Sequence, residues 1–185
     1  MRKLADGLLD LMSLPGQWVG WLILPLILSV LVGIAAAAMG FNVLIDWEGR
    51  LFVLGRRMTV NTLIDLQWYI FALIVLFGGV YALRDERHVS VDFLYQLASD
   101  RTQILLRLFG DAVFLVPFCL IITYYGVGFT ITSYTTGEGS AQGGLQNRWL
   151  IKACIPIAFG LLALSGVVRI LTGLAALLGP TTRRS

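Results

Sequence analysis

The side chains that could do chemistry in this chain are few, and they stand at the ends of long apolar runs. Asp65 precedes one run. Asp111 and Arg169 belong to two other runs and lie near the opposite face of the membrane from Asp65. Ionisable groups deep in a membrane are by default a sign of ion or proton transport, but no carboxylate falls halfway along any run. Arg107 and Asp111 are helical neighbours at i, i+4, and Arg169 lies where it can reach the interface and share that carboxylate across helices. We interpret these charges as groups that fix helix depth, with a proton or ion relay as the alternative.

The only histidine, His88, lies in a charged stretch between two apolar runs. One histidine cannot ligate a haem from both faces or build a histidine-rich metal site, and no nucleophile stands beside it. We predict a structural polar cluster of Arg84, His88 and Asp92 at a cytoplasmic elbow. We expect no catalytic, substrate-binding or metal site and no cofactor.

The same elbow carries arginines, whose forked guanidinium groups bind phosphate well. The candidates for contacts with lipid head groups are Arg84, Arg87, Arg101 and Arg107. The alternative explanation is the ordinary excess of basic residues on the cytoplasmic side of a membrane protein.

Cys119 and Cys154 both lie inside apolar runs. If these two runs are antiparallel helices, the depths of the two thiols differ by about 16 Å. A disulfide requires Cα atoms within about 7 Å of each other. We therefore predict two free thiols.

The elements that must position these residues are four apolar runs, each long enough to cross a bilayer. The hydrophobic fraction of the chain is 57% and the mean hydropathy is +0.81. About 20 apolar helical residues cross the hydrocarbon core. The predicted spans cover about residues 18–45, 62–84, 105–134 and 149–178. The fold class is an all-α membrane protein, with residues 1–185 forming a single four-span domain and no room for a nucleotide-binding domain.

Two further segments have the pattern of amphipathic helices that lie in the membrane surface. The first covers about residues 1–14, where Pro15-Gly16 is expected to end it, and the second covers about 90–100, between spans two and three. Asn61-Thr62 is expected to cap the second span.

Lysine and arginine counts predict that both termini face the cytoplasm. The predicted cytoplasmic side holds nine: Arg2, Lys3, Arg84, Arg87, Arg101, Arg107, Arg169, Arg183 and Arg184. The other side holds five: Arg50, Arg56, Arg57, Arg148 and Lys152.

Helix association in lipid relies on small residues that let backbones approach, and several residues here are candidates for packing on a partner or within the bundle. Those in the spans are Gly33, Ala37, Gly40, Pro156 and Gly160. Those near the outer mouth of the spans are Asp65, Trp68, Trp149 and Lys152.

Several motifs occur in an order and spacing that resemble a known family. They are the run Gly78–Asp92, the tetrad Asp65–Trp68, the loop with Glu138-Gly139-Ser140 and Gly143-Gly144-Leu145, the segment Arg148–Lys152, and Ile155-Pro156 with Phe159-Gly160. Together they resemble the small membrane subunit, DctQ-like, of tripartite ATP-independent periplasmic (TRAP) transporters. The chain departs from the pattern at Asp46, at Gln146-Asn147 and at Ser165.

The resemblance implies a scaffold rather than an enzyme. In this family a periplasmic binding protein delivers an organic anion, commonly a carboxylate, to a large membrane subunit, which moves it by a sodium-driven elevator motion. The small subunit packs on the large one in the bacterial inner membrane and coordinates neither substrate nor sodium. The expected partners are therefore the large subunit, the binding protein and phospholipids, with no nucleic acid. The alternatives are an autonomous small transporter or channel, and the membrane anchor of an enzyme complex.

Overall fold

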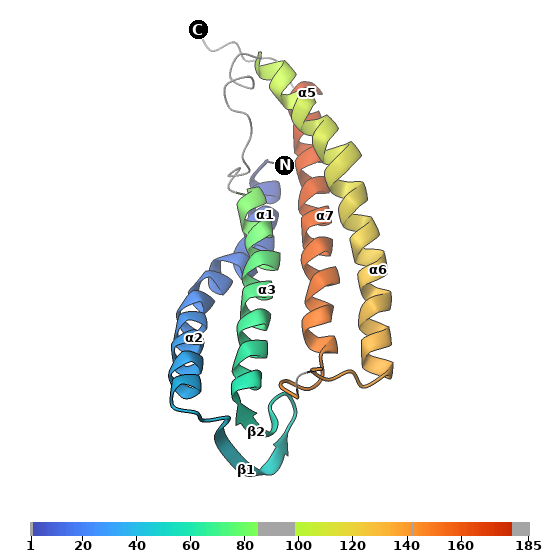
Figure 1. Ribbon diagram of the computed structural model, residues 1–185. Helices are drawn as coiled ribbons and strands as arrows, with labels where there is room; N and C mark the ends of the chain where they lie inside the picture. Colours follow the sequence, from blue (N-terminus) through green and yellow to red (C-terminus); the bar gives the residue numbers. More distant parts are fainter. Residues whose placement is uncertain (1, 85–98, 142, 179–185) are drawn as a thin grey trace.

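The computed structural model describes residues 2–84, 99–141 and 143–178, and helices dominate it (Figure 1). The first helical stretch comprises α1 (Arg2–Val19), the 3-10 turn η1 (Gly20–Leu22) and α2 (Ile23–Ala38). A hairpin of β1 (Val43–Leu51) and β2 (Gly55–Thr59) leads into α3 (Val60–Arg84). The chain continues with α5 (Asp100–Gly110), the π-helical turn η2 (Asp111–Leu115), α6 (Val116–Thr135) and α7 (Trp149–Leu178).

The long helices form a single layer rather than a closed bundle. In Figure 1 they lie side by side in the order α2, α3, α7, α6, with α2 and α6 at opposite edges. Only 11% to 22% of the residues in their most apolar windows are buried. Most of the apolar surface therefore points away from the chain, as lipid or a protein partner requires.

Four helical stretches are long and apolar enough to cross a membrane, which confirms the predicted number of spans. They cover Asp6–Ala38, Val60–Arg84, Arg101–Thr135 and Trp149–Leu178. We call the end of the layer that carries the β hairpin and residues 136–148 the hairpin end. The other end, which carries residues 83, 111 and 169, is the Asp111 end.

The first span ends at Ala38 instead of near residue 45, because Gly40 terminates the helix. Gly40 has φ +73°, a conformation that favours glycine. The amide of Phe41 donates to the carbonyl of Ala36 at 2.9 Å, and the amide of Gly40 to that of Ala37 at 3.1 Å, which is the Schellman pattern. Gly40 thus terminates the helix. No described atom lies within 4 Å of its Cβ position, so it does not pack within the layer, and its packing on a partner stays a prediction.

The N-terminal helix does not stop at Pro15-Gly16 as predicted, but continues to Val19. It packs on α3 and α7. The two helices α1 and α3 touch at Gly16, where a Cβ atom would lie 2.5 Å from the carbonyl oxygen of Phe77. This tertiary contact overrides the local preference of the proline to end a helix.

Thr59 caps α3, two residues before the predicted Asn61-Thr62, and Thr62 of that pair takes part in the cap. The Thr59 hydroxyl accepts from the amide of Thr62, and the Thr62 hydroxyl accepts from the amide of Thr59, both at 3.2 Å. This reciprocal arrangement satisfies two backbone donors at the start of the helix.

Small residues make the closest contacts between the helices. Cys119, Gly126 and Ser133 of α6 are buried at seven-residue spacing. A Cβ atom on Gly126 would lie 3.2 Å from Pro156 of α7, so the two helices touch there. Such close approach is a usual basis of helix association in lipid.

Candidate functional site

The polar side chains with long-range contacts gather at the two ends of the layer. At the hairpin end, β1 and β2 pair antiparallel, with Asp46 opposite Arg57. The indole nitrogen of Trp47 donates to the carbonyl of Gly55 at 2.9 Å and holds the two strands together. Gly55 has φ +70°, which suits the tight connection between the strands.

The loop of residues 136–148 closes over this hairpin. The amide of Gln146 donates to the carbonyl of Val53 at 2.8 Å, and the side-chain amide of Asn147 donates to the carbonyl of Phe52 at 2.6 Å. Leu145 is 1% exposed, and its amide donates to Oδ2 of Asp65 at 3.0 Å. The loop therefore bridges the hairpin and the first turns of α3.

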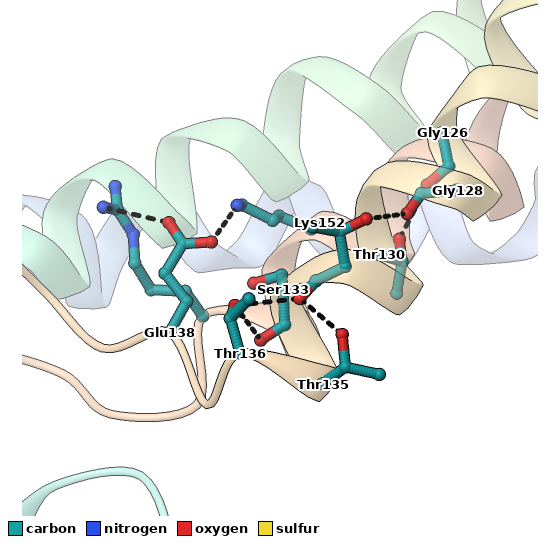
Figure 2. A network of polar contacts seen from close by, with 10 residues as sticks. Gly126, Gly128, Thr130, Ser133, Thr135, Thr136, Glu138 and Lys152 are labelled. Atoms are coloured by element: carbon teal, nitrogen blue, oxygen red, sulfur yellow. Dashed lines mark hydrogen bonds and ion pairs between the residues drawn. The ribbon is translucent and has the colours of Figure 1, made fainter.

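Glu138 lies between two cations at the junction of α6 and α7 (Figure 2). Its carboxylate pairs with the ammonium group of Lys152 and lies 3.8 Å from the guanidinium of Arg148. The hydrogen bond from Lys152 is the main cause that lowers the pKa of Glu138 below its ordinary value of 4.5. The Lys152 ammonium also lies 3.9 Å from the centre of the Phe129 ring, a cation–π contact.

One buried ion pair dominates the Asp111 end. Nε of Arg169 lies 3.0 Å from Oδ2 of Asp111, with 17% and 10% of the two side chains exposed. The same guanidinium donates to the carbonyl of Leu83 at 3.0 Å. The pair thus joins α3, α7 and the π turn that precedes α6. It confirms the expectation that Arg169 pairs with the Asp111 carboxylate across helices.

Between the two ends, the small hydroxyl groups bond to their own helices. Ser29, Thr123 and Ser165 donate to the carbonyls of Leu26, Cys119 and Leu161, each at 2.8 Å. Within the described ranges, no group of three or more His, Cys, Asp or Glu side chains could hold a metal ion. Cys119 and Cys154 are free thiols, as predicted.

Of the predicted elbow cluster, only Arg84 belongs to the described residues, and it pairs with Asp10 of α1. His88, Asp92 and Arg87 lie outside those residues, as does nearly all of the predicted surface helix 90–100. Arg101 and Arg107 are exposed. The lipid contacts proposed for these arginines stay a prediction.

The packing candidates from the sequence separate into three groups. Gly33 faces Gln67 and Leu63 of α3, and Pro156 is buried against α6, so both pack within the layer. Asp65, Lys152 and Trp149 belong to the hairpin end, where the Trp149 ring lies 5.4 Å from that of Tyr134. Ala37 and Trp68 are exposed, and Gly160 has no atom within 4 Å of its Cβ position.

Sequence reasoning missed the hairpin and the bridges made by the loop 136–148. The available signals were the glycines at 55, 137 and 143, each of which has a positive φ that permits a tight turn. None of these glycines indicates which partner its loop will contact.

The four long apolar helices indicate a multi-pass membrane protein. Residues 49–176 match the family of tripartite ATP-independent periplasmic transporters, DctQ component. No curated protein matches the chain significantly.

The chain therefore belongs to the DctQ family, whose members are the small membrane component of TRAP transporters. It is a transporter component, and the family works with a large TRAP membrane subunit and a periplasmic binding protein.

Proposed function

We propose that this chain is the non-catalytic scaffold subunit of a sodium-driven TRAP transporter in the bacterial inner membrane. It packs on the large elevator subunit, which imports an organic anion delivered by the periplasmic binding protein. The chain itself binds neither the anion nor sodium.

The observation that supports this proposal is the depth of the charged side chains. Asp65 and Lys152 lie in the first turns of α3 and α7, whereas Arg169 follows Trp149 by 20 residues, or about 30 Å of helix. That distance is about the thickness of the hydrocarbon core. The described parts of the four spans thus carry their charges at the two ends, and a solute-binding site at mid-membrane has no charged group to use.

A fixed scaffold also needs anchors that resist tilting and sinking. We propose that α1 lies near the cytoplasmic membrane surface, with Trp18 and Trp21 in the aromatic belt. These two side chains are 73% and 70% exposed. In this orientation both termini face the cytoplasm and the hairpin end faces the periplasm, where the binding protein docks.

The proposal is tested by coexpressing the tagged chain with a large TRAP membrane subunit and purifying the complex in mild detergent. We expect a stoichiometric complex, and we expect reconstituted vesicles to take up substrate only with the binding protein and a sodium gradient. Vesicles that contain this chain alone should take up nothing. Accumulation of an organic acid by the chain alone would overturn the scaffold function.

A further inference from the structure

The two edges of the helix layer expose different chemistry. At one edge, α2 presents aliphatic side chains, among them Ile27, Leu28 and Leu31, which are 51%, 62% and 59% exposed. Its one hydroxyl, that of Ser29, is buried. At the other edge, α6 presents two adjacent tyrosines, Tyr124 and Tyr125, which are 76% and 71% exposed.

These tyrosines lie at a depth where tyrosine is unusual. They stand at the middle of the apolar run 113–134, and Tyr125 precedes the end of α6 at Thr135 by ten residues, or about 15 Å. Tyrosine favours the membrane interface because its ring is apolar while its hydroxyl needs a polar partner. Helical side chains lean toward the N-terminus of their helix, so both rings lean away from the hairpin end and not toward the nearer interface.

Neither hydroxyl has a hydrogen-bond partner among the described residues. The two rings contact each other edge to face, with centroids 5.4 Å apart. The neighbouring Thr123, in contrast, donates to the carbonyl of Cys119. Lipid tails offer no acceptor, so an exposed phenol hydroxyl at this depth is unfavourable unless another protein supplies one.

We propose that the face of α6 around Tyr124 and Tyr125 is the surface on which the large TRAP membrane subunit packs. A helix of that subunit lies against the shallow hollow on α6 that these tyrosines line with Phe129 and Ile131, and accepts hydrogen bonds from the two hydroxyls. Gly128 also lines the hollow and has no atom within 4 Å of its Cβ position, so a partner backbone has room to approach. The aliphatic edge of α2 faces lipid.

This inference rests on the proposed function, because the partner is the large subunit. It commits to that partner because an acceptor at mid-membrane must come from another membrane-spanning protein, and the family works with one. A second copy of this chain is an outcome that the test distinguishes.

The test places the photo-crosslinking residue p-benzoylphenylalanine at Tyr125 or, as a matched control, at Leu28. Both side chains are well exposed, and each lies ten residues before the end of its helix. After coexpression with the large subunit, we expect irradiation to give an adduct with that subunit from position 125 and none from position 28.

The outcomes separate the inference from the function on which it rests. If the large subunit copurifies but the adduct forms from position 28, from neither position, or at position 125 with a second copy of this chain, the inference is wrong and the proposed function stands. If no large subunit copurifies with the unmodified chain, the proposed function fails first.

A second variant isolates the hydroxyls. The double substitution Tyr124→Phe with Tyr125→Phe keeps both rings and removes both hydroxyls. We expect recovery of the large subunit from detergent to fall by about threefold per hydroxyl, the usual scale of a hydrogen bond between membrane helices. Unchanged recovery would contradict the hydrogen-bonded form of the interface, even where the position 125 adduct forms.

Discussion

The two ends of this small protein are held together in opposite ways. At the Asp111 end, one buried ion pair joins three helical elements, with Arg169 binding both Asp111 and the carbonyl of Leu83. At the hairpin end, several weaker contacts share the task. They include the Leu145–Asp65 bond, two bonds from the loop 136–148 to the hairpin, and the ion pairs of Glu138.

The difference follows from the surroundings of each end. The guanidinium of Arg169 is largely enclosed, so the loss of its partner leaves a charge that water screens poorly. Glu138 is more open to water, with 35% of its side chain exposed, and its ion pairs are correspondingly weak. We therefore expect one substitution to destabilise the Asp111 end strongly. At the hairpin end, we expect each single substitution to cause a smaller loss of stability.

The largest effect should come from Asp111→Ala, which leaves Arg169 buried without its carboxylate. Breaking a buried pair by removing one partner costs about 3–5 kcal/mol. For a chain of this size that corresponds to a fall of about 10 °C in the midpoint of thermal unfolding. The midpoint is measured in detergent as loss of the monodisperse peak in gel filtration after heating.

The matched control for this prediction is the double variant Asp111→Ala with Arg169→Met. Replacing both partners by apolar groups removes the uncompensated charge, so the double variant should be more stable than Asp111→Ala alone. If the fall in thermal midpoint of the double variant equals the sum of the falls of the two single variants, the two side chains do not act as a pair that joins these helical elements.

At the hairpin end the largest effect should come from Gly144→Ala. A Cβ atom at this position would lie 2.1 Å from Oδ2 of Asp65 and 3.0 Å from the carbonyl oxygen of Asn61. The loop must shift and give up the bond between Leu145 and Asp65, at a cost of about 1–3 kcal/mol. We expect faster trypsin cleavage at Arg148 and a lower thermal midpoint, by less than for Asp111→Ala.

Gly139→Ala is the control for this substitution, because it lies in the same loop and has no atom within 4 Å of its Cβ position. It should cleave at the rate of the unmodified protein. Equal effects of the two substitutions would indicate a general loosening of the loop instead of a collision with Asp65.

The features that the sequence predicted correctly are those governed by length and depth. Four apolar runs predict four spans because few other structures satisfy twenty apolar residues in a row. The pair of Asp111 and Arg169 followed from the same reasoning, since the helical rise sets how deep each residue lies. Such constraints act along one helix and need no knowledge of tertiary contacts.

The features that the sequence did not predict depend on turns and on contacts between distant segments. Phe41, Val43 and Ile45 are as compatible with a strand as with a span, so the apolar pattern continued past the helix end at Ala38. The contact between Asp65 and Leu145 joins residues 80 positions apart. It depends on a loop with positive φ at Gly143 and Asn147, which residue spacing does not reveal.

The smallest effect should come from Glu138→Gln, and it should depend on pH. The hydrogen bond from Lys152 is the main cause that lowers the pKa of Glu138 in the folded protein. Its contribution to stability is therefore present above the ordinary pKa of 4.5 and is lost as the pH falls through the lowered value. At pH 7 the variant should unfold at a slightly lower temperature than the unmodified protein, and near pH 3 the difference between the two midpoints should shrink.

High salt should also reduce the difference between the two midpoints, because a partly exposed ion pair is screened. A difference that persists in acid would mean that the contribution of Glu138 to stability does not come from its charge, and the ion pairs would then not help to hold the hairpin end.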